Sequence, residues 1–271
     1  MIDGGNTGAR NMAVDEAIAV AHSRGHVPPT LRLYEWNPPA VSIGYFQDLS
    51  KEIDLEACRG LGVDWVRRPT GGRAVLHEDE VTYSVVISER LLPGSVLETY
   101  LELSRGLVAA LRLLGADPQL AQGALPGGGR GASPACFDSP AWYEMTCGGK
   151  KVVGSAQTRR NGVILQHGSI PVYMDARRVV SVLRLDSDDL RRRLEKNLAQ
   201  KAVGLQQVLG RAVARDEVMD AVQKGFAAGL GLEFERGGLT AFEVELAVNL
   251  EREKYSRSAW NEQRQGRGQH V

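Results

Sequence analysis

A helical hydrophobic period appears near the start of the chain. Asn11 is a residue type that caps helices, and Asp15 and Glu16 would then fall in the first turn, where the helix dipole favours acidic side chains. The pattern therefore predicts a helix that begins at Asn11 and buries one face. That face is expected to consist of Met12, Val14, Ala17, Ile18 and Ala21.

Short apolar and alternating runs predict strands in the first two thirds of the chain. Apolar side chains occupy every second position from Val81 to Ile87, which is typical of a half-buried strand. Asn161-Gly162 separates two apolar runs and is a strong hairpin signal. The other segments expected to form strands are 30–36, 40–46, 63–66, 141–147, 150–160 and 162–172.

Helical patterns dominate from Asp175 onward, and Thr240 and Glu243 form a capping box at the start of one of these helices. Strands followed by helices predict an α+β fold. We expect residues 1–195 to form the main domain and residues 196–271 to form a helical C-terminal extension packed on it.

The composition narrows the functional classes. The 271-residue chain has 33 Lys and Arg against 33 Asp and Glu, so its net charge favours no nucleic-acid partner. Its three cysteines are too few for a disulfide scaffold and indicate a reducing compartment. No signal peptide or membrane-spanning run is visible. The sequence predicts a cytoplasmic protein with no membrane partner, and we expect a monomer.

The segment RRPTGGRAVLH, residues 67–77, combines two glycines and three cations in one predicted turn. Gly71 and Gly72 permit backbone conformations and close approaches that other residues do not. The turn therefore indicates that a polar or anionic group comes close to the backbone.

A glycine-rich stretch, residues 123–140, separates the two groups of strands and contains Cys136. It can be a linker. Long loops inside compact domains are often substrate loops or lids, however, and on that ground we favour a functional loop.

Six motifs occur in an order that resembles the lipoate–protein ligase and octanoyltransferase superfamily, and they span residues 2–261. This resemblance implies a mixed-sheet catalytic domain of the biotin/lipoate–protein ligase type. The motifs are NMAVDEAI, LRLYEWNPPAVSIGYFQ, RRPTGGRAVLHEDEVTYSVV, KKVVGSAQTRR, GVILQHGSI and EKYSRSAWN.

Within this superfamily the chain most resembles the Gram-positive type of octanoyl-[acyl-carrier-protein]:protein N-octanoyltransferase. Ligases usually carry a third glycine in the turn, where nucleotide phosphate lies against backbone amides, and this chain has Arg73 there. The segment SPACFDSPAWYE also resembles the one in which the transferases carry their nucleophilic cysteine. Both features favour transfer from a thioester.

The resemblance makes Cys136 the candidate nucleophile and Lys151 its catalytic partner. A thiolate attacks thioesters readily, and a nearby ammonium lowers the thiol pKa and stabilises the oxyanion. A lone cysteine is otherwise more often a buried apolar residue, which is the interpretation we prefer for Cys58. Cys147 remains a less favoured candidate for the nucleophile. A solvated hairpin lysine is the alternative for Lys151, and it fits Lys150 better.

The remaining candidates are expected to bind substrate. Gly154 and Ser155 let the acyl chain pass close to the strand. His77 can instead cap the following turn, and His167 orients either the acyl carbonyl or a strand. No metal site, Ser/His/Asp triad or cofactor is indicated. Gly71 and Gly72 let the substrate come close to the backbone, and the residues expected to line the pocket mouth are Arg68, Thr70, Arg73 and His77.

We therefore expect an enzyme of lipoate biosynthesis that moves an octanoyl group from octanoyl-acyl carrier protein to a lysine of a lipoyl-domain protein, such as the glycine-cleavage H protein. Carrier proteins are acidic, so a local basic patch is needed, and Arg159, Arg160 and residues 191–193 are candidates. For residues 191–193 we prefer the alternative of a solvated helix face. One alternative is an ATP-dependent lipoate–protein ligase. The other is a non-catalytic protein that binds acyl groups or lipoyl domains.

Overall fold

The computed structural model describes residues 1–122 and 143–263, and two sheets organise this part of the chain. The larger sheet has the strand order β1-β2-β6-β10-β9-β8-β7, and the smaller one has the order β4-β3-β5. The strands are β1 Ile2–Asn6, β2 Thr30–Trp36, β3 Ala40–Ile43, β4 Asp64–Arg67, β5 Val75–His77, β6 Glu80–Ser88, β7 Gln119–Gln122, β8 Tyr143–Cys147, β9 Lys150–Arg160 and β10 Val163–Pro171.

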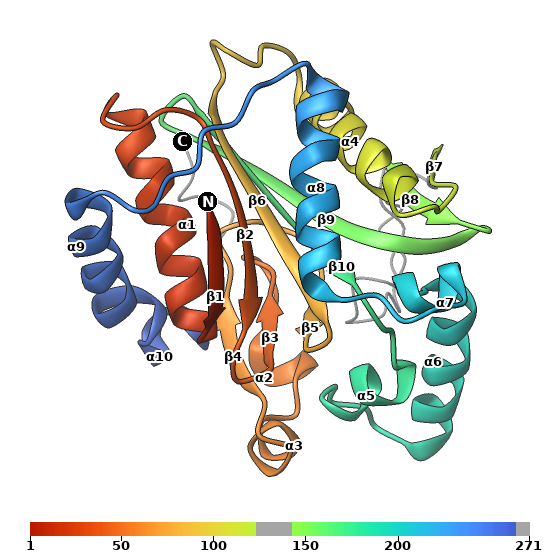
Figure 1. Cartoon of the computed structure of the whole chain (residues 1–271). Helices are drawn as coiled ribbons and strands as arrows, with labels where there is room; N and C mark the ends of the chain where they lie inside the picture. The colour runs from red at the N-terminus through yellow and green to blue at the C-terminus, as the bar shows by residue number, and fades with distance from the viewer. Residues whose placement is uncertain (123–142, 264–271) are drawn as a thin grey trace.

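Helices cover both faces of the larger sheet, and this mixed architecture confirms the predicted α+β class (Figure 1). α4 and α8 pack together over one face, whereas α1 lies on the other face with α9 beside it. The helices are α1 Gly8–Ser23, α2 Leu49–Glu52, α3 Leu55–Gly60, α4 Val96–Leu113, α5 Ala176–Ser181, α6 Asp188–Lys201, α7 Leu205–Leu209, α8 Arg215–Leu230, α9 Ala241–Leu250 and α10 Ser258–Asn261, with a π-helical turn at Glu251–Tyr255.

The alternation along β6 explains how one strand serves two layers. Val81, Tyr83 and Val85 enter the core beneath α4 and α8. Thr82 and Ser84 point to the opposite face, where Ser84 donates to an α1 carboxylate. The α1 side of the sheet is therefore partly polar and buried, and the pocket described below lies there.

The first helix begins earlier than the sequence pattern predicts. Thr7 is the N-cap, and its hydroxyl accepts a hydrogen bond from the Arg10 amide. The prediction that Asn11 caps the helix is therefore wrong, and Asp15 does not lie in the first turn. Asn11 is instead fully buried inside the helix, where its amide donates to the carbonyl of Glu35 at 2.9 Å.

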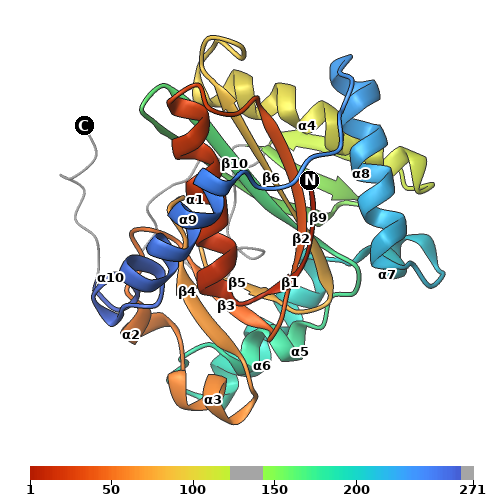
Figure 2. The same cartoon turned by 60° about the vertical axis from the view of Figure 1, so that its left-hand side comes forward.

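The C-terminal segment packs against α1 through α9, as Figure 2 shows, and α10 contacts β4. Thr240 and Glu243 form the capping box expected from the sequence. Farther along, Asn261 accepts a hydrogen bond from the Arg67 amide at 2.8 Å. The end of the described chain thus supports the strand that leads into the glycine turn.

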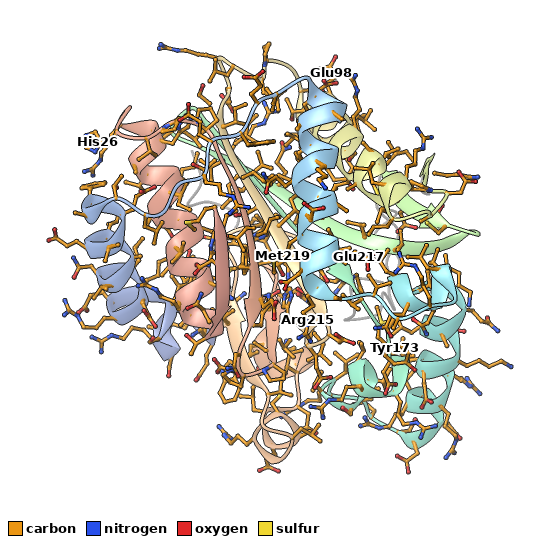
Figure 3. The ribbon with its side chains drawn as sticks, in the orientation of Figure 1. His26, Glu98, Tyr173, Arg215, Glu217 and Met219 are labelled. Carbon is orange, nitrogen blue, oxygen red and sulfur yellow. The ribbon has the colours of Figure 1, made fainter. Side chains whose placement is uncertain are left out.

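Arg215, at the start of α8, makes a second link between the late helices and the sheets (Figure 3). It donates to Asp79 Oδ1 at 2.9 Å and lies 3.5 Å from Glu35 Oε2. Asp79 belongs to the bend between β5 and β6, so this contact fixes the short connection between them. No helix in the described part of the chain is both long and apolar enough to span a membrane.

Candidate functional site

A pocket opens between the α1-facing side of the larger sheet and the smaller sheet. Its apolar wall comes from Met12, Tyr34, Trp36 and Val75. Among the residues predicted to bind substrate, six line this pocket: Arg68, Gly72, His77, Gly154, Ser155 and His167. The structure therefore brings together residues from the turn, β5, β9 and β10 that are far apart in the sequence.

Thr70, Arg73 and Lys151 are not part of the described pocket lining, and neither is Gly71. Thr70 is fully buried and contacts the His167 ring. Arg73 reaches away to Glu52 on α2, with 3.5 Å between Nη1 and Oε2. Lys151 lies three positions before Gly154 on β9. Cys136 lies outside the described residues.

Arg68 occupies the inside of the glycine turn. Its guanidinium donates to the carbonyls of Gly71 at 2.8 Å and Arg73 at 2.7 Å. Gly72 has a φ of +94°, a conformation that favours glycine. The Gly72 carbonyl also lies 2.0 Å from the point where a Cβ on Gly44 would sit. The conformation of the turn therefore requires glycine at position 72, and its close approach to β3 requires glycine at position 44.

Replacing Gly44 with alanine should destabilise the protein because the new Cβ overlaps the Gly72 carbonyl. Overpacking of this kind costs about 1–3 kcal/mol, or roughly 2–10 °C in melting temperature for a chain of this size. Thermal unfolding measures the shift. Gly71→Ala is the matched control, since nothing lies within 4 Å of its added Cβ, and an equal shift in both variants would contradict the steric explanation.

Arg67 supports the turn from the opposite side, and its side chain is fully buried. Its guanidinium donates to the carbonyls of Gly44, Tyr45 and Gln47 at 2.8–3.0 Å. It also donates to the carbonyl of Asn261 at 2.9 Å. Burial lowers the pKa of Arg67. Arg67 is one of the three cations of the predicted turn, but the structure places its charge in this cage of carbonyl groups.

His167 belongs to a buried polar chain that crosses from α1 to the turn. Its Nδ1 lies 3.2 Å from Asp15 Oδ2, and its Nε2 lies 2.7 Å from the Thr70 hydroxyl. Asp15 also accepts hydrogen bonds from Arg32 at 2.8 Å and Tyr34 at 2.9 Å. Burial would raise the Asp15 pKa, but the contacts with His167 and Arg32 outweigh it and hold that pKa below its ordinary value.

His77 belongs to a second chain of the same kind. Its Nδ1 lies 2.7 Å from Glu80 Oε1, and its Nε2 lies 2.7 Å from the Ser42 hydroxyl. The ring stacks on Trp36 with 3.9 Å between centroids. Burial would raise the Glu80 pKa, but its partners keep that pKa below its ordinary value. Those partners are His77, Ser169 and Thr82.

Burial lowers the pKa of His167 below 6.5, although the Asp15 contact opposes this shift. The unfolded chain therefore takes up a proton at this residue before the folded protein does, and stability is lost as the pH falls below the unfolded value. We expect the unfolding free energy in urea to decrease from neutral pH to about pH 5. His167→Gln should show a shallower decrease, and an unchanged slope would contradict this assignment.

Lys151 is buried at the beginning of β9, with 5% of its side chain exposed. Its Nζ lies 3.3 Å from Glu144 Oε1 on the neighbouring strand β8. Its neighbour Lys150 instead donates to the Ala199 carbonyl at the surface. The alternative of a solvated hairpin lysine, considered for Lys151, thus describes Lys150.

The two described cysteines are both buried. Cys58 belongs to the core beside the smaller sheet, as expected, and burial raises its thiol pKa to about 11. Burial, together with the charge of Asp117, also raises the thiol pKa of Cys147. Neither environment favours a thiolate near neutral pH.

The roles of Asp15, Glu80 and Ser42 were not predicted from the sequence. A signal was present in the first helix, where Asn11 and Asp15 lie one turn apart among apolar residues. Both are fully buried and bind the Arg32 guanidinium. In residues 1–122 and 143–263, no group of three or more His, Cys, Asp or Glu side chains is arranged to hold a metal ion.

Comparisons with known proteins agree with this architecture. The chain is 53% identical to an octanoyltransferase LipM of Kyrpidia tusciae, over 95% of this chain and 96% of that protein. It is 41% identical to octanoyltransferase LipM of Bacillus subtilis, over 97% of both. A bipartite lipoate protein ligase of Thermoplasma acidophilum superposes with a TM-score of 0.80 at 27% identity, covering 98% of this chain and 96% of that one.

The family model of the lipoyl protein ligase A/B catalytic domain matches residues 7–227. This match covers β2 to β10 and the turn between β4 and β5. The family expected from the six motifs is therefore confirmed: the chain belongs to the lipoyl protein ligase A/B catalytic domain family.

Proposed function

We propose that this protein is an octanoyltransferase that moves an octanoyl group from octanoyl-acyl carrier protein to a lysine of a lipoyl-domain protein, such as the glycine-cleavage H protein. The observation that carries the proposal is identity of 41–53% over nearly the whole chain to proteins named octanoyltransferase. The buried cation at Lys151 and the partly apolar pocket on the same strand supply the chemistry that such a transfer needs.

The transfer proceeds in two steps through Cys136. The Cys136 thiolate attacks the thioester carbonyl, and the carrier's thiol leaves, so the acyl group becomes bound to the enzyme as a new thioester. The acceptor amine then attacks this carbonyl, the Cys136 thiolate leaves, and the amine loses its proton. Lys151 stabilises the oxyanion in both steps, with Glu144 holding its ammonium.

The acyl chain is placed over β9 and β10. Gly154 and Gly168 bring the backbone of the two strands to the pocket, and Met12 and Val75 supply apolar contacts. No cofactor is required, because the donor thioester is already activated.

The acidic carrier is expected to meet a basic surface at the β9–β10 hairpin. Arg159 is already bound to the start of α4, where it donates to the Gly94 carbonyl at 2.9 Å and to Thr99 at 2.8 Å. Arg160 is exposed at the end of β9. Of the two hairpin arginines, Arg160 is thus the one available to a partner. These reactions are assigned to the cytoplasm, and the enzyme is proposed to act as a monomer.

The requirement for ATP separates this function from the ligase alternative. Purified protein, octanoyl-acyl carrier protein and a lipoyl domain should yield octanoylated domain with no nucleotide present. If modification required ATP and free octanoate, the protein would be a ligase. Binding of both partners without modification under either condition would support the non-catalytic alternative.

A further inference from the structure

Two buried carboxylates beside the pocket have no part in the acyl-transfer steps. The side chains of Asp15 on α1 and Glu80 on β6 are 0% and 3% exposed. Each contacts the Nδ1 of one histidine, and each histidine contacts one hydroxyl through its Nε2. Burying two charged groups is costly unless they are paired, so an arrangement repeated on two sides of one turn calls for a physical reason.

Both chains of contacts end on the same side chain. Arg68 Nε donates to the Thr70 hydroxyl oxygen at 3.2 Å, and Arg68 Nη1 donates to the Ser42 hydroxyl oxygen at 3.1 Å. We propose that Asp15 and Glu80 are positioning residues that hold Arg68 inside the glycine turn through two parallel carboxylate–histidine–hydroxyl relays. The relays run Asp15–His167–Thr70–Arg68 and Glu80–His77–Ser42–Arg68.

The placement of hydrogens makes each relay directional. An ionised carboxylate only accepts, so the neutral His167 ring carries its proton on Nδ1 and leaves Nε2 as an acceptor. The Thr70 hydroxyl then donates to Nε2, and its oxygen is free to accept from Arg68. In the second relay, Glu80 accepts from Nδ1 of the neutral His77 ring, and the Ser42 hydroxyl donates to Nε2 and accepts from Arg68. Each carboxylate thereby fixes one histidine tautomer and one hydroxyl rotamer.

The consequence for the turn follows from what Arg68 binds at its other end. Its guanidinium takes the carbonyls of Gly71 and Arg73, which fixes the orientation of these peptide groups. In the part of the chain that the structure describes, neither the Gly71 nor the Gly72 amide has an acceptor. The relays therefore hold a turn whose amides remain available for a polar group in the pocket.

Nitrogen-15 NMR of the two imidazole rings tests the relays without any assay of activity. In the unmodified protein, the neutral rings of both His167 and His77 should carry their proton on Nδ1 and none on Nε2. Asp15→Asn should change the tautomer signature of His167 and leave that of His77 unchanged, whereas Glu80→Gln should do the reverse. Ser84→Ala is the control, since Ser84 donates to Asp15 Oδ1 but belongs to neither relay.

Protonation on Nε2 of either ring in the unmodified protein would overturn the proposal. A change at both rings in each carboxylate variant would also overturn it, because it would show a general loss of structure in place of two separate relays. The tautomers of the unmodified protein still test the direction of both relays if a carboxylate variant fails to fold.

A double-mutant cycle tests the convergence on Arg68, and this part rests on the proposed octanoyl transfer. Thr70→Val and Ser42→Ala each remove one hydroxyl, and each should lower kcat/KM about fivefold, as expected for one lost hydrogen bond. Because either relay alone still holds Arg68, the double variant should lose about tenfold more than the product of the single effects. In an Arg68→Gln background this coupling should vanish. Purely multiplicative losses with Arg68 present would overturn the convergence, whereas inactivity of the unmodified protein would count against the proposed function alone.

Discussion

Replacing Cys136 with serine should abolish octanoyl transfer and leave the fold intact. The serine hydroxyl is a far weaker nucleophile than a thiolate near neutral pH, and an oxygen ester would be a less activated intermediate for attack by an amine. Loss of a catalytic nucleophile typically lowers turnover by about three orders of magnitude or more. The measurement is octanoylation of a lipoyl domain, followed by mass spectrometry, with circular dichroism to verify the fold.

Cys147→Ala is the matched control for this experiment. Cys147 is buried, its thiol pKa is raised, and its side chain packs in the core beneath α4 and α8, so its replacement should leave most of the activity. Full activity of Cys136→Ser together with an inactive Cys147→Ala would transfer the nucleophile to Cys147 and contradict the present assignment.

Replacing Lys151 with alanine should lower kcat by about a hundredfold or more, since it removes the buried cation that we propose stabilises the developing oxyanion. Loss of the ammonium should also raise the pKa of the Cys136 thiol if the two groups are adjacent, and alkylation of Cys136 at neutral pH should then be slower. Turnover is measured with octanoyl-acyl carrier protein, and alkylation is measured with iodoacetamide.

Lys150→Ala provides the comparison within the same hairpin. Lys150 donates to the Ala199 carbonyl near the surface, so its removal should change turnover and alkylation little. Equal losses in the two variants would indicate that the hairpin as a whole matters and would remove the specific role of Lys151. An unchanged alkylation rate in Lys151→Ala would show that Lys151 and Cys136 do not interact.

The elements with a clear period were predictable from the sequence because local pattern and final burial agree there. β2 and β9 have the predicted bounds, and β6 and β10 lie within a residue or so of theirs. The start of α1 was not predictable in this way. Asn11 is a residue type that caps helices, but in the structure it is a buried hydrogen-bond partner of Arg32. Its role depends on β2, which no local pattern around Asn11 contains.

The position of Arg68 and Gly72 at the pocket was predictable, because a single motif carries both residues. The relays were not predictable from the sequence. Asp15 belongs to α1 and Thr70 to the turn, and they are connected through His167 on β10. The sequence pattern placed His77 at the pocket mouth and indicated no Ser/His/Asp triad. Folding brings hydroxyl, imidazole and carboxylate together twice, from segments up to 152 positions apart.

Intact-mass spectrometry tests the central proposal most directly. The protein is mixed with octanoyl-acyl carrier protein in the absence of any lipoyl domain and of ATP, and its mass is then compared with that of the untreated protein. A covalent acyl-enzyme predicts an increase equal to one octanoyl group, which is lost on treatment with hydroxylamine and on addition of the lipoyl domain and is not formed by Cys136→Ser. Transfer of octanoate to the lipoyl domain at the normal rate by Cys136→Ser, with no acyl-enzyme formed by the unmodified protein, would contradict it.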